Sequence, residues 1–207
     1  MSLPRLYGAD YSVYVRIVRL VLAECGQDYD FVEIDIFDPA KLPLDYATRQ
    51  PFGKIPAFEQ DGFRLYETDA IAHYVNEALG GGRLMPFGPR QRAGCLQIMR
   101  IVDNYAYRPL VWEIYVAEKE GSGEATTAVK EAAARVLGVL EECHQGPYLC
   151  GPALTLADLW LLPVIAYLRL APSGPALLAP HPKLAAWWLT MAERPAVLAT
   201  RFPSERT

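Results

Sequence analysis

Apolar and polar residues follow two different periods in the first eighty residues, which predicts a mixed α/β domain there. Residues 3–7 form a short apolar run closed by Gly8, and residues 29–36 alternate apolar with polar side chains, which is typical of strands. Between them, Ser12 precedes apolar residues at helical spacing that end at the stop signal Gly26, which predicts a helix. This order favours two parallel strands joined by a right-handed crossover.

The second half of this domain gives one weak signal and two strong ones. Residues 38–50 contain few apolar anchors and two prolines, and we expect one short, irregular helix there. The runs 55–58 and 63–66 flank an Asp-Gly pair, a strong tight-turn signal between antiparallel strands. Apolar residues then repeat with a period of 3.6 as far as Gly80, which predicts another helix.

A glycine- and proline-rich stretch, GGGRLMPFGP, separates this domain from a region with only helical patterns. The expected helices are 90–120, 124–144, 155–170 and 183–194. Of these, 155–170 is apolar on all sides and should be the most buried helix. Thr155 and Asp158 form a capping box at its start, and we expect them to have a structural role. The predicted limits are an α/β domain at 1–80, a linker at 81–89 and an all-helical domain at 90–207.

Composition and charge narrow the possible partners. The hydrophobic content is 52% and the net charge is -4, so the chain offers no general attraction for nucleic acid or for anionic lipid. The longest uncharged apolar run, 159–168, has ten residues, whereas a membrane-spanning helix needs about 20. We therefore expect no nucleic-acid partner and no membrane partner.

Cysteine and histidine spacing indicates neither a redox motif nor a metal site. The four cysteines are Cys25, Cys95, Cys143 and Cys150, and the three histidines are His73, His144 and His181. No pair has the spacing of a redox CxxC or of zinc ligands. We expect no metal, and this cysteine usage fits the reducing cytoplasm better than export.

The stretch 51–74 combines features that suit the binding of an extended peptide. Ile55-Pro56 stands where a loop enters a strand, and only X-Pro bonds adopt the cis form at low cost. A cis bond there would present the backbone of Ile55 to a peptide ligand, although a trans proline at a strand start is an alternative. Glu67 and Thr68 begin a helix, where they could hold the charged ends of a ligand or could simply cap the helix.

Four motifs in this order resemble the soluble glutathione S-transferases, most closely the phi-like and related bacterial classes. They are PFGKIPAF, DGF and LYETDAIAHY in the first domain and LTLADLWLLPVIAYL in the second, and the resemblance covers essentially the whole chain. It implies a thioredoxin-like N-terminal domain of order βαβαββα followed by an all-helical C-terminal domain. It further implies a glutathione transferase with glutathione as co-substrate, located in the cytoplasm and assembled as a homodimer.

The resemblance also implies a set of glutathione-binding residues. Glu67 and Thr68 would hold the γ-glutamyl group, and the backbone of Ile55, with Pro56 in cis, would pair with the cysteinyl residue. Lys41 and Lys54 would lie near the glycyl carboxylate. The alignment at Lys41 needs a shift of one residue, and a solvated surface lysine is its alternative role.

The catalytic position implied by the resemblance is Ser12, in the segment YGADYSVYVRIVRL, which resembles the serine type although Val13 replaces a common proline. Lowering a thiol pKa of ~8.5 by ~2 requires about 2.7 kcal/mol of preferential thiolate stabilisation. A hydrogen bond to a charged group supplies ~1.5 to 3 kcal/mol and a helix N-terminus ~0.3 to 1 kcal/mol, so one hydroxyl suffices. The alternatives are that Ser12 is only an N-cap, or that Tyr7 or Tyr11 acts on the thiol.

Candidates for the second-substrate pocket follow from position in the same resemblance. They are Tyr11, Asn104, Tyr105, Arg108 and Trp112, of which the last four could equally form an interface. The predicted reaction is conjugation of the glutathione thiolate to small hydrophobic electrophiles. The alternatives are a non-catalytic binding or assembly module of the same fold, or a glutathione-dependent peroxidase or isomerase using the same site.

Overall fold

The computed structural model describes residues 2–38, 41–119, 121 and 123–206. They form two compact units, one reaching to Arg83 and including the C-terminal segment from Ala199, the other spanning Leu84–Leu198. The sequence pattern assigned the whole C-terminal segment to the helical domain, whereas the structure places it with the first unit. No helix among the described residues is both long and apolar enough to cross a bilayer.

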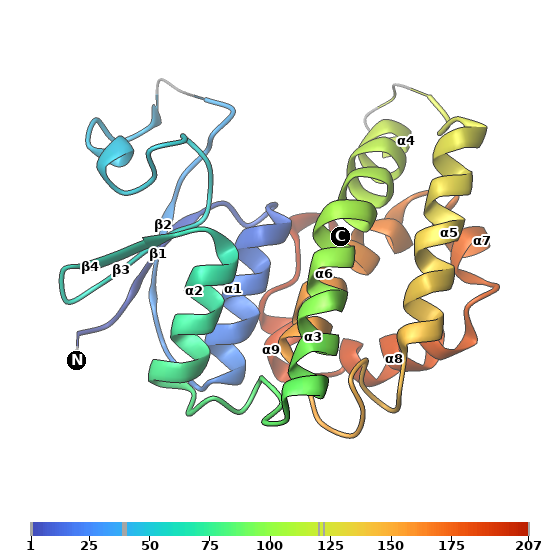
Figure 1. The fold of residues 1–207 in the computed structure, drawn as a ribbon. Coiled ribbons are helices and arrows are strands. Elements are labelled where there is room, and N and C mark those ends of the chain that lie inside the picture. Colours follow the sequence, from blue (N-terminus) through green and yellow to red (C-terminus); the bar gives the residue numbers. More distant parts are fainter. Residues whose placement is uncertain (1, 39–40, 120, 122, 207) are drawn as a thin grey trace. The chain divides into compact units, whose positions relative to one another are not determined.

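The first unit is built around one four-stranded sheet (Figure 1). Its elements are β1 Arg5–Gly8, α1 Val13–Glu24, β2 Asp30–Glu33, η2 Tyr46–Thr48, β3 Ala57–Gln60, β4 Phe63–Tyr66, α2 Thr68–Tyr74 and η3 Val75–Leu79. The sheet order is β2-β1-β3-β4, with β1 and β2 parallel and the other neighbours antiparallel. The predicted thioredoxin-like order is confirmed, including the crossover and the hairpin.

Alternating side chains account for the packing of this sheet. Leu6 on β1 and Phe58 on β3 are register partners and are 0% and 1% exposed. They are covered by α1, whose Ile17 and Leu20 are fully buried, while α2 packs beside α1 (Figure 1). Burying this much apolar surface fixes the register, because a shift of one residue would turn each side chain to the other face.

Two local predictions in the first unit differ from the structure. Residues 38–50 were expected to form one short helix; within their described part the 3₁₀-helix η2 spans Tyr46–Thr48, and residues 39 and 40 lie outside the described residues. Tyr46 is the anchor of this segment, since it is only 2% exposed. The third strand begins at Ala57 rather than at Ile55, because Pro56 has no N–H to give to a ladder.

In the described residues of the second unit, the regular elements are helices apart from one isolated bridge. Its elements are α3 Pro89–Ile101, η4 Val102–Ala106, η5 Arg108–Val116, α4 Ala117–Lys119, α5 Thr127–Cys143, α6 Leu156–Leu170, α7 Gly174–Leu178, α8 Pro182–Ala192 and α9 Pro195–Ala199. Every residue from Leu156 to Leu168 is buried. The prediction that this helix is the most buried one is confirmed for the described residues.

The start of α6 is organised by the buried carboxylate of Asp158, which is 0% exposed. It accepts hydrogen bonds from the Thr155 N–H and hydroxyl, both 2.8 Å, and from the Leu149 N–H at 2.8 Å and the Trp187 Nε1 at 2.9 Å. The expected structural role of this pair is confirmed. The two residues form the predicted capping box, and the Thr155 hydroxyl also donates to the carboxylate.

The predicted helix at 90–120 is continuous in its described part, but the number of residues per turn changes along it. After α3 the chain continues as two π-helical segments, η4 and η5, before α4 ends at Lys119. Residue 120, the predicted end, lies outside the described residues. Pro109 stands at the start of η5 and cannot donate a helical hydrogen bond, which is one identifiable cause of the altered register.

Candidate functional site

The register of the sheet brings three separate segments to one edge of the first unit. Tyr7 on β1 pairs with Ala57 on β3, and Ala57 pairs with Tyr66 on β4. The turn after β1, the loop before β3 and the residues after β4 therefore meet at the same end of the sheet. This end is the sheet edge of the first unit. Ser12, the Ile55-Pro56 bond and the start of α2 are the parts of these segments that the sequence analysis singled out.

Two helices begin at this edge of the sheet. Ser12 is the N-cap of α1, and Thr68 is the first residue of α2, which continues through η3 to Leu79. A helix N-terminus carries unsatisfied N–H groups and a partial positive charge. The edge is thus prepared for a negatively charged ligand, whether a carboxylate or a thiolate.

The Ile55-Pro56 peptide bond is cis. The ladder between β1 and β3 ends at the pair Tyr7–Ala57, so the backbone of Ile55 lies beyond the paired part of the strand. The Tyr46 hydroxyl donates to the Lys54 carbonyl at 2.7 Å and so ties the preceding loop to η2. This arrangement leaves Ile55 positioned to pair with an extended peptide in the manner of an added strand.

Glu67 adopts a backbone conformation that non-glycine residues seldom use. Its φ is 70°, and holding such a residue there costs about 1 to 3 kcal/mol unless the surroundings fix it. Its side chain makes no capping bond although it occupies the N-cap position of α2, and it is exposed, whereas Thr68 is buried. A strained backbone that presents an exposed carboxylate beside a helix N-terminus is typical of a ligand contact.

Ser12 caps α1 and keeps a second hydrogen-bonding capacity. Its Oγ accepts from the Val15 N–H at 3.3 Å, which is the N-cap role considered from the sequence. A hydroxyl has two acceptor lone pairs and one donor proton. The cap uses an acceptor position, so the same side chain can also donate to a thiolate, and the two roles do not compete.

The two rival tyrosines use their donor protons elsewhere. The Tyr7 ring is 6% exposed, its hydroxyl donates to Glu59 Oε2 at 3.3 Å, and the Arg49 guanidinium stacks on it at 5.1 Å. The Tyr11 hydroxyl donates to Asp35 Oδ1 at 3.1 Å. Burial, together with the hydrogen bond to Asp35, raises the pKa of Tyr11 to about 12. This arrangement favours Ser12 as the group that acts on a thiol.

The two lysines differ in their surroundings. Lys41 is an exposed residue whose Nζ pairs with Asp38 Oδ2 at 2.8 Å, which is the arrangement of a solvated surface lysine. Lys54 is exposed and directly precedes Ile55. Of the two, Lys54 has the better position for the carboxylate of a peptide bound along Ile55.

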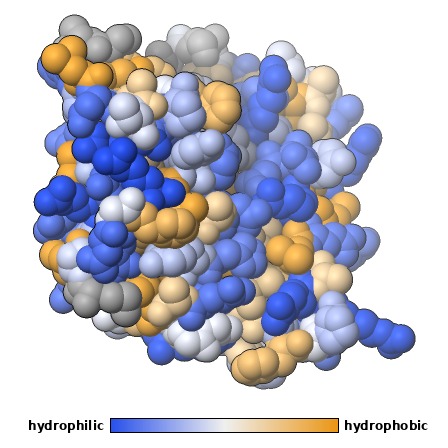
Figure 2. Space-filling model, turned by 60° about the vertical axis from the view of Figure 1, so that its left-hand side comes forward, coloured by the Kyte–Doolittle hydropathy of each residue, from blue (hydrophilic) through white to orange (hydrophobic). Residues whose placement is uncertain are grey.

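Two aromatic rings lie together next to the turn that carries Ser12. The rings of Tyr11 and Phe37 are 5.7 Å apart, and Phe37 is 67% exposed. Figure 2 shows hydrophobic groups dispersed among hydrophilic ones over the face that it displays. Exposed aromatic rings beside a polar helix terminus suit a ligand with a charged part and an apolar part.

The remaining second-substrate candidates lie on the π-helical part of the second unit. Asn104 and Tyr105 belong to η4, and Arg108 and Trp112 to η5; all four are exposed. Arg108 pairs with Glu113 at 2.8 Å. Tyr105 also lines a groove of about 490 Å³ within this unit.

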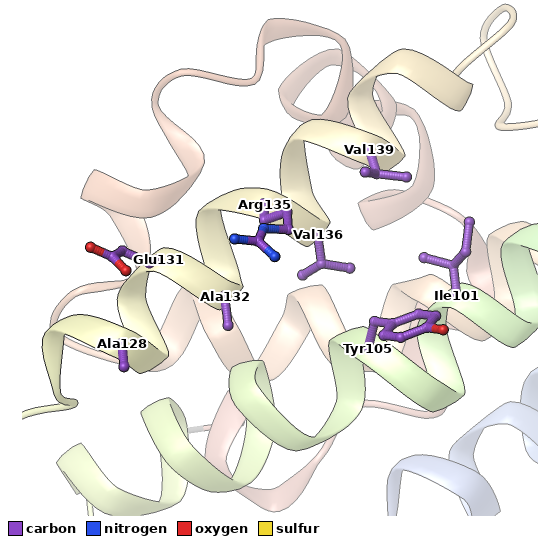
Figure 3. Close-up of a pocket in the computed structure, with 8 residues that line it drawn as sticks. All are labelled: Ile101, Tyr105, Ala128, Glu131, Ala132, Arg135, Val136 and Val139. Atoms are coloured by element: carbon purple, nitrogen blue, oxygen red, sulfur yellow. The ribbon is translucent and has the colours of Figure 1, made fainter.

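Figure 3 shows that groove between Ile101 and Tyr105 on one side and α5 on the other. The α5 residues that line it are Ala128, Glu131, Ala132, Arg135, Val136 and Val139. Tyr105 is 66% exposed within it. Residues of this kind are also common at interfaces between proteins, which was the alternative considered for this helix.

Sequence reasoning missed two residues that shape the first unit's site. Tyr46 holds the loop before Ile55, and Asp35 holds Tyr11 and also accepts from the Phe37 N–H at 3.0 Å. Each acts through a contact made by folding, and no local spacing signals it. Among the described residues, no group of three or more His, Cys, Asp or Glu side chains could hold a metal ion.

The cis-proline before an antiparallel strand, the parallel β1–β2 pair and the following helical unit define a thioredoxin-like protein with a second, all-helical part. Residues 6–83 match the family described as "Glutathione S-transferase, N-terminal domain", and residues 105–195 match "Glutathione S-transferase, C-terminal domain". The chain belongs to the glutathione S-transferase family. The family expected from the sequence motifs is therefore confirmed.

Similar proteins cover almost the whole chain. Glutathione S-transferase F7 of Arabidopsis thaliana is 31% identical over 202 residues, which span 93% of this chain and 96% of that protein. Glutathione S-transferase 3 of Zea mays is 32% identical over 208 residues, or 95% and 92% of the two chains. Among solved structures, glutathione S-transferase III in apo form has a TM-score of 0.81 at 30% identity, covering 98% of both chains.

Proposed function

We propose that this chain is a glutathione transferase in which Ser12 stabilises the glutathione thiolate for attack on small hydrophobic electrophiles. The observation that carries the proposal is the geometry of Ser12, whose oxygen caps α1 through Val15 while its hydroxyl proton remains chemically able to donate. The relatives support it, since those named above are glutathione S-transferases. One similar structure, 27% identical with a TM-score of 0.82, is glutathione S-transferase-I bound with the ligand lactoylglutathione.

In the proposed complex, glutathione lies across the end of the sheet and pairs with the backbone just before β3. The backbone of Ile55 pairs with the cysteinyl residue, Glu67 and the start of α2 hold the γ-glutamyl group, and Lys54 lies near the glycyl carboxylate. Lys41 is a weaker candidate for that carboxylate because its charge is already paired with Asp38. Charge-assisted hydrogen bonds of this kind contribute about 1.5 to 3 kcal/mol each.

The chemical step needs no general base on the protein. The thiol loses its proton to solvent, and the thiolate is held by the Ser12 hydroxyl and the N-terminus of α1. The sulfur then forms a bond to the electrophilic carbon of the second substrate, and the leaving group departs with its electron pair. We propose that Tyr11 and Phe37 provide an apolar wall for that substrate. Asn104, Tyr105, Arg108 and Trp112 of the second unit stay predictions from the family resemblance.

The proposal also covers the setting in which the protein acts. We propose a homodimer, as expected from the family resemblance, and a location in the cytoplasm, on the ground of its cysteine usage. Glutathione is the co-substrate and no metal takes part in the scheme.

A spectral titration of the bound glutathione thiol tests the function. We expect thiolate absorbance to develop about 1 to 2 pH units below that of free glutathione, for which a thiol pKa of ~8.5 is the reference. Bound glutathione with an unshifted thiol pKa would favour the non-catalytic binding module. A shifted thiol pKa without conjugation of aryl halides, but with peroxide reduction, would favour the peroxidase.

A further inference from the structure

The C-terminal segment of the first unit is attached to α1 immediately behind Ser12. Arg16, one helical turn after Ser12, is 0% exposed, and its guanidinium pairs with the carboxylate of Glu205. The ring of Phe202, also 0% exposed, lies 4.3 Å from the guanidinium carbon. A buried charge of this kind requires a partner, because leaving it without one is strongly destabilising.

The same segment makes a second contact, with a residue that precedes Ser12 in the sequence. Arg206 Nη1 lies 3.7 Å from Asp10 Oδ2, and Arg206 Nη2 donates to the Arg201 carbonyl at 2.7 Å. Glu205 Oε2 also accepts from the Phe202 N–H at 2.8 Å. The segment 202–206 is therefore internally braced, and it contacts the chain two residues before Ser12 and four residues after it.

These contacts bear on the turn that carries the hydroxyl. The Ser12 N–H donates to the Ala9 carbonyl at 3.1 Å, and the Ser12 carbonyl accepts from the Arg16 N–H at 2.9 Å. The backbone N–H that holds the Ser12 carbonyl therefore belongs to a residue whose side chain is anchored by Glu205 and Phe202. The position of the Ser12 hydroxyl is thus coupled to where Arg16 and Asp10 are held.

We propose that the segment 202–206 is a positioning element of the thiol-activating site, in which Glu205 acts through Arg16 to fix the turn that bears Ser12. This inference rests on the proposed function of Ser12. Glu205 is a positioning residue because it touches Arg16 and Phe202 and not the thiol. It deepens the proposed mechanism by adding a part of the chain that lies almost two hundred residues from Ser12.

Positioning and simple charge effects predict opposite shifts of the thiol pKa. If the segment only neutralised Arg16, then Glu205→Gln would leave a positive charge near the thiolate and would lower the thiol pKa. If the segment positions Ser12, loosening it weakens the hydrogen bond to the thiolate and raises the thiol pKa. Phe202→Leu loosens the same segment without any change of charge, so it separates the two effects again.

The test uses the full chain, with glutathione as ligand and a dinitrochlorobenzene as electrophile. For Glu205→Gln and for Phe202→Leu we expect kcat to fall by about fivefold or more and the bound thiol to titrate roughly half a pH unit higher. The dissociation constant of glutathione should stay within about twofold, because Ile55 and Glu67 are untouched. Arg201→Gln is the matched control, since it removes an exposed charge from the residue immediately before the segment and should leave kcat and the thiol pKa unchanged.

Several results would overturn the inference. A lower thiol pKa in Glu205→Gln with wild-type kcat in Phe202→Leu would reduce the segment to a charge partner. Equal losses of kcat and glutathione affinity, together with a loss of helical circular dichroism, would reduce it to a structural strap. If Glu205→Gln does not fold, Phe202→Leu alone decides between these outcomes. Wild-type turnover in Ser12→Ala would refute the role of Ser12 and the positioning role with it, whereas a defect in Ser12→Ala with wild-type behaviour in both segment variants would refute only the latter.

Discussion

Candidate site residues lie at the sheet edge of the first unit and on the π-helical segment 102–116 of the second unit. The positions of these residues are determined in different ways in the two regions. At the sheet edge, the register of three strands and a cis peptide bond fix where Ser12, Ile55 and Glu67 lie. On the helical segment, exposed side chains project from a helix with altered periodicity. Backbone geometry defines the first site, and only side-chain choice defines the second.

Ser12→Ala should have the largest effect, because it removes the one donor assigned to the thiolate. We expect kcat to fall by about 10- to 100-fold, the equivalent of the ~1.5 to 3 kcal/mol of a hydrogen bond to a charged group. Glutathione affinity, measured by calorimetry, should stay within a few fold.

Thr126→Ala is the matched control for this loss of an N-cap. Thr126 caps α5 through the Val129 N–H at 3.4 Å, as Ser12 caps α1. Both variants should lose about 1 kcal/mol of helix stability, and only Ser12→Ala should lose turnover. Equal turnover in the two variants would transfer the role to another donor at the sheet edge.

Glu67→Ala should mainly weaken binding. Its exposed carboxylate is assigned to the charged amino end of glutathione, so the dissociation constant should rise by about tenfold or more. At saturating glutathione, kcat should change little. Glu77→Ala removes another exposed acid from the same helical stretch and should bind normally, while an unaltered affinity in Glu67→Ala would mean that the γ-glutamyl group lies elsewhere.

The sequence indicated most of the sheet edge because its special residues have local signatures. Pro56 indicates a possible cis bond, and Asp61-Gly62 indicates a hairpin. Ser12 and Thr68 indicate where two helices start. The supporting contacts of Tyr46 with Lys54 and of Arg16 with Glu205 have no such signature. Both arise only when the chain is folded, and the second joins positions almost two hundred residues apart.

The helical segment was less predictable for a different reason. Asn104, Arg108 and Trp112 were chosen by their position in the family resemblance, and that position does not say which way each side chain of a π-helical stretch faces. Tyr105 lines the groove beside α5, a contact that its position in the sequence did not indicate. Helical spacing predicts a face only where the helix is regular.

Tyr46→Phe tests whether the second layer of the sheet edge matters for binding. It removes the hydrogen bond to the Lys54 carbonyl, which should cost about 1 kcal/mol of unfolding free energy and weaken glutathione binding by about threefold. Tyr29→Phe is the control, since its hydroxyl accepts from Arg19 Nε at 2.9 Å elsewhere in the unit. Urea unfolding should show losses in both variants, and calorimetry should show weaker binding in Tyr46→Phe alone.

Trp112→Ala tests the helical segment directly. Trp112 is 45% exposed and is predicted from the family resemblance to contact the second substrate. If it does so through apolar contact alone, the KM for a hydrophobic electrophile should rise by about two- to threefold. Glutathione affinity should be unchanged. Tyr105→Ala, which alters the groove beside α5, should leave that KM as it is; the reverse result would move the pocket to the groove.

Tyr11→Phe should have the smallest effect at neutral pH and a visible one in alkali. Since its hydroxyl donates to Asp35, removing it should change kcat by less than about twofold.

The folded-state pKa of Tyr11, about 12, lies above the ordinary value of 10.0, so the unfolded chain releases this proton first. The stability contributed by the neutral phenol is therefore present below pH 10 and is lost as the pH rises toward 12. Thermal unfolding between pH 9 and pH 11.5 should show a shallower decline in Tyr11→Phe than in the wild type. A tenfold loss of kcat at neutral pH would instead make Tyr11 the donor to the thiolate and leave Ser12 with its N-cap role alone.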